Sequence, residues 1–150
     1  MESIKISRAK ISDVHQIYLL GKRIRELDFS AKYPFYQLSE LKESVSRSKE
    51  NCLLTAKSKD TVVGFILAKI LSHPAGGWCL LDDLGVAPEY RNMGLGKSLL
   101  NSLYKEMKAR KINYIQILES NNRKTRSFWK KMGFRETKTF IWAEKTIKIH

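Results

Sequence analysis

The chain has 150 residues, which is enough for one domain with a hydrophobic core and too few for two domains of ordinary size. Hydrophobic residues make up 43% and charged residues 29% of the sequence, and these fractions exclude a disordered or fibrous protein. The formal net charge is +13, and residues 91–150 hold 15 Lys and Arg against 4 Asp and Glu, which indicates either an anionic partner or a well-solvated, lysine-rich surface.

The N-terminal part of the chain predicts a strand followed by a helix. Residues 3–9 alternate and predict a short strand. Residues 12–27 carry apolar side chains at helical spacing, with Ser12 or Asp13 as the N-cap. Residues 28–37 are aromatic and irregular, contain a proline and predict a loop.

The middle of the chain predicts a second helix and three strands. Residues 38–50 predict a shorter helix with Ser39 as its cap. Residues 51–72 predict two strands joined by a polar turn at residues 58–60, and residues 78–86 predict a third strand.

The clearest helix is predicted over residues 94–110, after a loop at residues 87–93. Apolar residues recur every four positions along this stretch, as expected for a helix with one buried face. These residues are Leu95, Leu99, Leu103 and Met107.

The C-terminal part predicts a strand, a helix and a closing strand. Residues 112–119 are rich in isoleucine and predict a buried strand, and residues 123–132 predict a helix that Gly133 ends. Residues 134–149 predict one long strand or two shorter ones. The order of elements indicates one mixed α/β domain spanning residues 1–150.

The sequence carries no sign of export, membrane insertion or a metal site. The N-terminus lacks the apolar core of a signal peptide, and the longest apolar run, residues 62–68, is far shorter than a membrane span. Cys52 and Cys79 lie in separate strand-like runs, and the three histidines share no metal-binding spacing. We therefore expect a cytoplasmic protein with buried free thiols and no metal.

The segment "RNMGLGKS" predicts an anion site at the start of a helix. The first N–H groups of a helix have no partner and carry a partial positive charge, and a glycine there lets a phosphate approach the backbone. Arg91 and Lys97 add cationic side chains. A P-loop requires four residues between its glycines rather than one, and Leu99 stands where a dinucleotide fingerprint has its third glycine, so neither motif fits.

The pattern Arg-x-x-Gly-x-Gly resembles the GNAT superfamily of N-acetyltransferases. The stretch "LDDLGVAPEYRNMGLGKSLLNSLYKEM" is similar to that family's strand, pyrophosphate loop and helix, and "NNRKTRSFWKKMGF" is similar to its second signature. The two occur in the family's order with a predicted strand between them. The resemblance implies a single domain with a central, mostly antiparallel mixed sheet that splays between its fourth and fifth strands and is flanked by about four helices.

The resemblance also implies where acetyl-CoA binds. Its pyrophosphate is expected on the amides of the glycine loop, and its pantetheine arm beside the fourth strand, pairing with the backbone as an added strand would. The residues expected to contact it are Leu84, Gly85, Val86, Arg91, Asn92, Met93, Gly94, Leu95, Gly96, Lys97, Ser98, Asn122 and Trp129. Alternatively, the glycines only shape the helix entry, Arg91 pairs with Glu89, or Asn122 is only an N-cap.

Two carboxylates within an apolar strand are the candidates for proton transfer. Amine acetylation requires a neutral amine, so a base is needed, and burying carboxylates without a purpose is costly. Strict alternation places Asp82 on the face of Leu84 and Val86, with Asp83 on the other face. We favour Asp82 as the base or as the anchor of the substrate amine, and we keep Asp83 as the alternative. In the non-catalytic alternative, both carboxylates cap the strand end or pair with nearby Lys or Arg.

The group that protonates the departing thiolate is not evident from the sequence. Trp129 stands where the family usually has a tyrosine, and an indole cannot serve as a general acid. Three alternatives stay open. Tyr90, Tyr104 or Tyr114 protonates the thiolate, the thiolate leaves without a general acid, or the activity differs from that of the family.

The acceptor is left open among a small-molecule amine, a polyamine and a protein or peptide amine. Aromatic residues that suit an ammonium occur where the family binds its acceptor, namely Phe29, Tyr33, Phe35, Tyr36, Phe140 and Trp142. The net charge of +13 opposes a polycation. We expect acetyl transfer to a primary amine by direct attack in a ternary complex and no membrane partner. Members of this family can form homodimers, and the sequence leaves the oligomeric state open. The alternatives are a non-catalytic CoA-binding regulator and a basic nucleic-acid-binding domain, against which the double signature counts.

Overall fold

The computed structural model describes residues 2–27, 35–73 and 76–150, which divide into two compact units, one ending at Leu118 and one beginning at Glu119. Each unit is described by itself below. Among these residues, no helix has both the length and the apolar character needed to cross a membrane.

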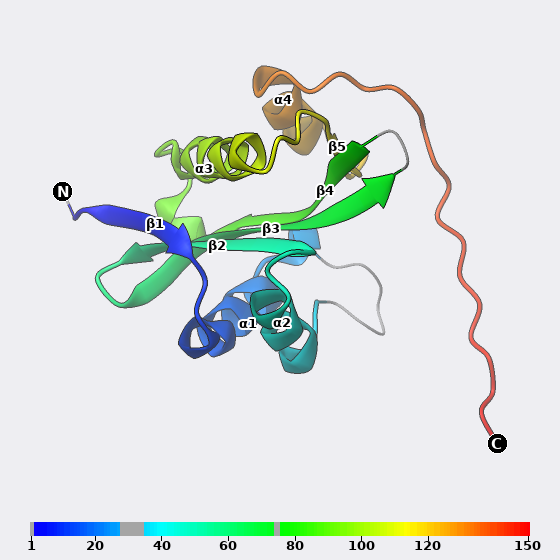
Figure 1. Ribbon diagram of the computed structural model, residues 1–150, viewed down its shortest axis with the longest axis horizontal. Helices are drawn as coiled ribbons and strands as arrows, with labels where there is room; N and C mark the ends of the chain where they lie inside the picture. Colours follow the sequence, from blue (N-terminus) through cyan, green and yellow to red (C-terminus); the bar gives the residue numbers. More distant parts are fainter. Residues whose placement is uncertain (1, 28–34, 74–75) are drawn as a thin grey trace. The chain divides into compact units, whose positions relative to one another are not determined.

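The first unit is built on a five-stranded mixed sheet in the order β1-β2-β3-β4-β5 (Figure 1). Neighbouring strands are antiparallel except β4 and β5, which are parallel. The mostly antiparallel sheet is therefore confirmed. The strands are β1 (Ile4–Arg8), β2 (Asn51–Ser58), β3 (Thr61–His73), β4 (Gly76–Val86) and β5 (Ile115–Ile117).

Helices cover both faces of this sheet (Figure 1). Helices α1 (Val14–Arg23) and α2 (Leu38–Ser46) lie on one face, and α3 (Leu95–Ala109) lies on the other. Short 3-10 turns η1 (Ile11–Asp13), η2 (Arg25–Leu27) and η3 (Pro88–Tyr90) connect these elements. The long predicted helix at residues 94–110 is confirmed, and the helix predicted over residues 12–27 is a regular helix flanked by two 3-10 turns.

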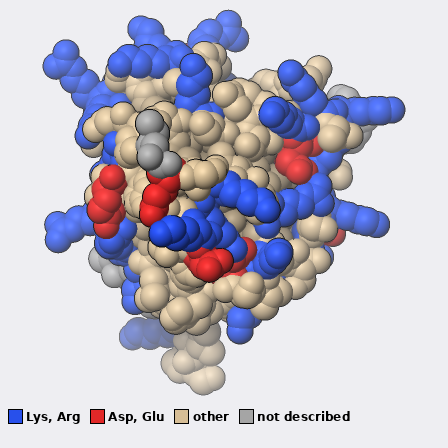
Figure 2. All heavy atoms as spheres, turned by 90° about the vertical axis from the view of Figure 1, so that its left-hand side faces the viewer, with Lys and Arg blue, Asp and Glu red and all other residues tan. Residues whose placement is uncertain are grey.

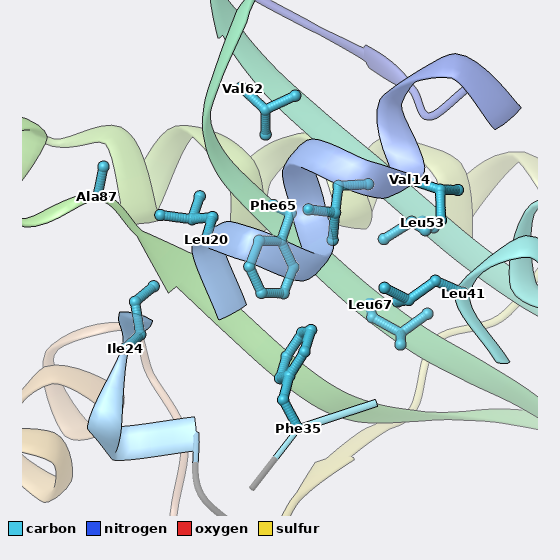
Figure 3. Packing of buried hydrophobic residues seen from close by; sticks show 11 residues of the cluster. Val14, Leu20, Ile24, Phe35, Leu41, Leu53, Val62, Phe65, Leu67 and Ala87 are labelled. Atoms are coloured by element: carbon cyan, nitrogen blue, oxygen red, sulfur yellow. The ribbon is translucent and has the colours of Figure 1, made fainter. Parts of the chain in front are cut away.

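The face beneath α1 and α2 holds the hydrophobic cluster drawn in Figure 3. Phe65 of β3 lies near Leu20 of α1, Leu67 of β3 lies beside Leu41 of α2, and Phe35 packs edge-on against Phe65 with ring centroids 5.8 Å apart. On the opposite face, α3 buries the apolar residues at its four-residue spacing, namely Leu95, Leu99, Leu103 and Met107. Two buried layers therefore hold the sheet between the helices.

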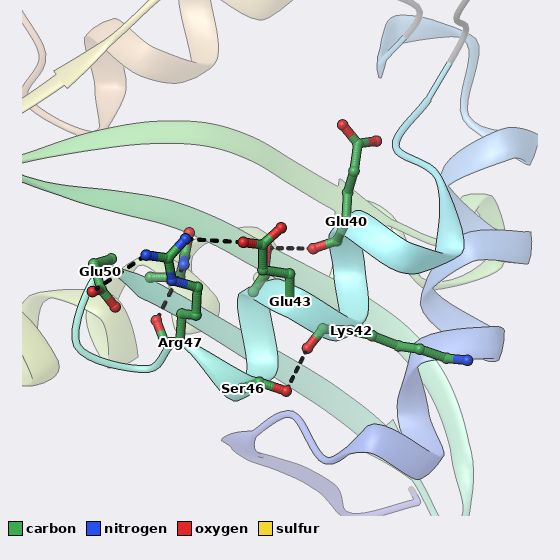
Figure 4. Close-up of polar contacts among 8 residues, drawn as sticks. Glu40, Lys42, Glu43, Ser46, Arg47 and Glu50 are labelled. Carbon is green, nitrogen blue, oxygen red and sulfur yellow. Dashed lines mark hydrogen bonds and ion pairs between the residues drawn. The ribbon is translucent and has the colours of Figure 1, made fainter.

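Helix α2 begins at Leu38, the first residue of the predicted stretch, and ends four residues before that stretch does, at Ser46. Gln37 occupies the N-cap position, and its backbone N–H donates to Oε2 of Glu40 at 2.7 Å. Gln37 and Glu40 thus form the capping box of α2, and Ser39 lies inside the first turn of the helix. The prediction that Ser39 caps this helix is therefore wrong. Figure 4 shows the last turn, where Arg47 pairs with Glu43 at 2.9 Å.

Asp13 has the position of an N-cap without that function. It precedes α1, but its carboxylate accepts from the backbone N–H of Lys10 and pairs with Lys57 of β2. The aspartate therefore ties the start of the helix to the sheet.

The sheet opens after the first part of β4. Strand β5 pairs with β4 only at Cys79, Leu80 and Leu81. In the described part of the chain, no strand pairs with the following stretch, Asp82–Val86, on that side. This is the splay between the fourth and fifth strands that the resemblance implied. Strand β5 is shorter than the predicted stretch 112–119.

The pairing of β3 with β4 contains an irregularity at the middle of β4. Leu67 pairs with Asp83, but the next residue, Ala68, pairs with Leu81, so Asp82 is an extra residue. Such a bulge breaks the alternation of side chains between the two faces. The prediction that Asp82 and Asp83 lie on opposite faces is wrong for this reason, as their contacts show below.

The second unit contains α4 (Arg123–Lys131), followed by residues without helix or strand. Gly133 has a φ of 90°, the left-handed conformation expected of a residue that ends a helix. The predicted strand at residues 134–149 is not found, and Ile141 and Ile149 are almost fully exposed. A strand requires a neighbouring ladder, which side-chain alternation alone does not supply.

Candidate active site

The loop after β4 leaves the first turn of α3 with free backbone donors. Asn92 and Gly94 have φ values of 60° and 77°, and the chain turns there into α3 at Leu95. Gly94 is the N-cap residue and has no side chain to accept from the first N–H groups, and no acidic residue lies in the first turn. The N–H groups of Leu95, Gly96 and Lys97 therefore form a positive end that suits an anion.

Gly94 is needed here for its backbone conformation. A Cβ at this position would meet nothing within 4 Å, so space is available, but a φ of 77° strains any other residue type. The structure therefore supports the helix-entry role of this glycine, which is compatible with anion binding. Ser98 donates its hydroxyl to the carbonyl of Gly94 at 3.1 Å and so stabilises the same turn.

Two arginine contacts fix the loop between β4 and α3. Nε of Arg91 donates to the carbonyl of Val86 at 3.3 Å. Arg23 of α1 donates to both carboxylate oxygens of Glu89, at 3.0 and 3.1 Å. The sequence predicted neither contact. Arg23 and Glu89 are far apart in the chain, so their pairing could not be read from local sequence.

The open edge of β4 presents the backbone groups of Leu84 and Val86. The N–H of Ala87 donates to the carbonyl of Val63 on β3. Because successive residues of a strand direct their backbone groups to opposite sides, those of Leu84 and Val86 point away from β3, toward the splay. This part of the expected cofactor site therefore has the backbone geometry required to pair with an extended ligand.

Two carboxyl groups, a tyrosine and a lysine gather at the bulge of β4. The Tyr36 hydroxyl donates to Oδ2 of Asp82 at 2.7 Å, and Nζ of Lys69 lies 3.2 Å from the same oxygen. Asp83 pairs with Leu67, whose side chain belongs to the cluster under α1 and α2. Tyr36 packs on that cluster as well, so both carboxyl groups lie on this face.

The two carboxyl groups differ in environment. Asp83 is 5% exposed, and its Oδ2 has no hydrogen-bond partner within the described residues. Burial, and then the charge of Asp82, raise the pKa of Asp83 to about 8. Burial, followed by the charges of Asp82 and Asp83, also raises the pKa of Tyr36, which therefore stays a neutral donor. A carboxyl group with a pKa near neutrality is suited to exchange a proton with an amine.

Tyr36 and Lys69 are site residues whose roles the sequence did not predict. Tyr36 was expected only as one of several aromatic residues near an acceptor. The sequence contains one sign that Lys69 is unusual, because this charged residue directly follows the apolar run of β3. Of the other expected aromatic residues, Phe35 is buried in the core, and Phe29 and Tyr33 lie outside the described residues.

The second unit holds Asn122 and Trp129. Oδ1 of Asn122 accepts from the backbone N–H groups of Lys124 and Thr125, at 2.9 and 3.3 Å, so this residue is the N-cap of α4. Trp129 is buried and packs edge-on against Phe128 and Phe134. A structural role for each is therefore established within the unit.

Within the described part of the chain, none of the three alternative tyrosines forms a hydrogen bond with Asp82 or Asp83. Tyr104 is partly buried, and burial raises its pKa. The hydroxyl of Tyr114 accepts from Nε2 of Gln116 at the exposed surface. Among the described residues, no three His, Cys, Asp or Glu side chains are grouped as metal ligands would be.

Comparisons with known proteins agree with this geometry. The sequence profile of the acetyltransferase (GNAT) family matches residues 18–134. An N-alpha-acetyltransferase from Sulfurisphaera tokodaii is 30% identical over 89% of this chain and 81% of its own length. A PaiA N-acetyltransferase from Thermoplasma acidophilum, crystallised with coenzyme A, is 25% identical, with a TM-score of 0.79 over 92% of this chain and 93% of its own. An aminoglycoside acetyltransferase from a soil metagenome, 15% identical, shares the fold with a TM-score of 0.77 over 97% of both chains.

Proposed function

The chain belongs to the GNAT family of acetyltransferases, and from this premise we propose that it transfers an acetyl group from acetyl-CoA to a primary amine by direct attack in a ternary complex. One observation carries this proposal, which is the open edge of β4. The carboxyl pair lies at the middle of this strand, and the start of α3, which has no side-chain cap, follows the strand's C-terminal end. This arrangement offers sites for a polyphosphate, an extended arm and a proton.

The residues of the first unit fit coenzyme A. The amides from Met93 to Lys97 would hold the pyrophosphate, helped by the side chain of Lys97. The backbone of Leu84 and Val86 would pair with the pantetheine arm, and Arg91 would yield or share the carbonyl that it now contacts. A family neighbour crystallised with coenzyme A supports this assignment. Asn122 and Trp129 stay predicted contacts of the same ligand.

Asp83 is the better proton acceptor of the pair, and Asp82 the better anchor. Oδ2 of Asp82 already accepts two contacts, whereas the Asp83 carboxyl has a free oxygen and a pKa of about 8. Acetyl-CoA supplies an activated acetyl thioester when bound. In the ionised fraction of Asp83, which grows as the pH rises toward 8, the carboxylate takes the amine proton as the N–C bond forms and the C–S bond breaks, directly or through a water molecule.

Protonation of the thiolate is assigned to solvent. Trp129 has no ionisable proton, and a thiol with a pKa near 8.5 leaves readily as its thiolate.

The buried thiols of Cys52 and Cys79 are free, which supports a location in the reducing cytoplasm.

Release of free thiol from acetyl-CoA over a panel of amines tests the proposal. The panel should include a peptide with a free N-terminus, a lysine-containing peptide, spermidine and an aminoglycoside. We expect amine-dependent thiol release and an increase in the melting temperature with coenzyme A. Stabilisation without turnover on any amine would favour a CoA-binding regulator, which Trp129 makes the second candidate. No stabilisation, with salt-sensitive binding to RNA or DNA, would favour a nucleic-acid-binding domain.

A further inference from the structure

The candidate active site contains a lysine that the proposed reaction does not use. Lys69 projects from β3 on the face covered by α1 and α2, with its ammonium 3.2 Å from Oδ2 of Asp82. Its side chain is 46% exposed, and that of Asp82 is 14% exposed. The ammonium therefore lies against the carboxylate and is the more exposed of the two groups, so a cationic acceptor that approached Asp82 would meet it.

The charges around the bulge nearly cancel. The Asp82 carboxylate faces the Lys69 ammonium, and Tyr36 contributes a neutral hydroxyl. Asp83 is mainly protonated at pH 7 because burial raises its pKa to about 8. Glu40 also acts on Tyr36, but it is exposed, and its carboxylate accepts from the N–H of Gln37. Among the described residues, the centre of the site therefore has no uncompensated carboxylate for a further cation.

We infer that Lys69 is a specificity-determining residue that disfavours polycationic acceptors and selects an amine that carries at most one charge and is partly neutral near pH 7.5, such as the α-amine of a peptide. The inference rests on the proposed function and adds to it the class of acceptor. Polyamines and aminoglycosides bring several positive charges to a place where an ammonium already neutralises the carboxylate.

The α-amine of a peptide matches such a site for a second reason. Its ordinary pKa is about 8, whereas that of an alkyl amine such as the lysine side chain is about 10.4. A substantial fraction of the α-amine is thus already neutral at pH 7.5 and needs no anionic site to hold it. A carboxyl group with a pKa of about 8, such as that of Asp83, exchanges a proton with this amine at little cost.

The protein's surface acts in the same direction over a longer range. Lys and Arg side chains project over much of the face shown in Figure 2, and the net charge is +13. This general repulsion is screened beyond about 8 Å at physiological salt, whereas the contact between Lys69 and Asp82 is much shorter. Salt therefore separates the two effects.

The test compares kcat/KM for spermidine and for a short peptide with a free α-amine and no lysine. It uses the full chain, Lys69→Met, Lys69→Arg and the control Lys105→Met, which removes one exposed charge from α3 on the other face of the sheet. We expect the unmodified protein to prefer the peptide. Lys69→Met should raise the spermidine-to-peptide ratio about three- to tenfold at both 0.15 and 0.5 M salt, while the two other variants leave it unchanged.

Each outcome decides between the two proposals. A general loss of activity in Lys69→Met does not alter the ratio, so a poorly folded variant does not imitate the expected result. A preference of the unmodified protein for spermidine, or a ratio that Lys69→Met leaves unchanged, overturns the role of Lys69 and leaves acetyl transfer intact. Absence of thiol release with every amine overturns the proposed function itself.

Discussion

The middle of β4 and the loop that follows this strand use different parts of the chain for their chemistry. At the bulge, Asp82 and Asp83 provide side-chain carboxyl groups whose properties depend on burial. At the start of α3, the donors are backbone N–H groups that are exposed and need only the conformation of Gly94 and the absence of a cap. The first site depends on its surroundings, and the second on local backbone geometry.

This difference determines how each site should respond to change. A substitution at the bulge alters the free energy of unfolding together with proton transfer, because the groups are packed into the core. A change of side-chain charge at the start of α3 alters ligand binding with little effect on unfolding, because the groups face solvent, whereas replacing Gly94 acts on the backbone conformation.

Replacing Asp83 with Asn should give the largest effect. We expect the transfer rate to fall on the order of 100-fold, because the variant loses the proposed proton acceptor. The unmodified protein should lose stability as the pH rises from about 4 to about 8, by up to about 1.4 kcal/mol for each pH unit, because the folded state holds the Asp83 proton more tightly than the unfolded chain does. Urea unfolding at pH 5 and pH 9 measures this slope.

The Asp83→Asn variant should lack that part of the slope and be more stable than the unmodified protein at pH 9. Asp60→Asn, at the exposed turn between β2 and β3, is the matched control and should leave both rate and slope unchanged. An unchanged rate in Asp83→Asn would return the role of base to Asp82. An unchanged slope would show that Asp83 is ionised in the folded protein at neutral pH.

Replacing Lys97 with Glu should separate binding from stability at the second site. A negative charge in the first turn of α3 stabilises the helix by about 0.3–1 kcal/mol but repels a pyrophosphate. We expect the Kd for coenzyme A, measured by calorimetry, to rise on the order of 10- to 100-fold while the melting temperature stays equal or rises.

Lys108→Glu is the control, since it makes the same charge change near the other end of α3. It should leave coenzyme A binding almost unchanged and lower the melting temperature slightly, because a negative charge opposes the dipole there. Equal losses of affinity in the two variants would mean that net charge, rather than the helix start, attracts the ligand.

The sequence predicted the second site better than the first for a physical reason. The glycine pattern and the four-residue spacing of α3 are local signals, and the structure confirms the helix that they predicted. The bulge depends on the register between β3 and β4, which no residue near Asp82 determines. Strict alternation was therefore wrong at this position, and Lys69 could not be placed beside Asp82.

Of the two other errors, one had a local signal and one depended on distant contacts. The cap of α2 depends on one residue, and the sequence contained the signal, because Glu40 follows Gln37 at the spacing of a capping box. The strand predicted over residues 134–149 depended on a partner that a pattern of alternation cannot supply. The errors at the bulge and over residues 134–149 thus arose where structure depends on contacts between distant segments.

Replacing Tyr36 with Phe should weaken the first site by a smaller amount. The variant keeps the ring that packs against Phe35 but loses the hydroxyl that donates to Asp82. We expect a loss of about 1–3 kcal/mol in the free energy of unfolding, because a charged acceptor loses one of its partners. Tyr114→Phe removes a hydroxyl that, among the described residues, bonds only to the exposed side chain of Gln116, and it should change this free energy by less than about 0.5 kcal/mol. Equal effects would show that the Asp82 contact contributes nothing.

Replacing Gly94 with Ala should have the smallest effect and should act through the backbone alone. The new Cβ meets nothing within 4 Å, but a φ of 77° costs a residue with a side chain about 1 kcal/mol. Gly77→Ala is the control, because a Cβ there meets only ordinary contacts and the φ is not in the left-handed region. We expect Gly94→Ala to lower the free energy of unfolding by about 1 kcal/mol and Gly77→Ala not to lower it. If Gly94→Ala instead weakens coenzyme A binding without any loss of stability, the ligand approaches the backbone at this residue itself.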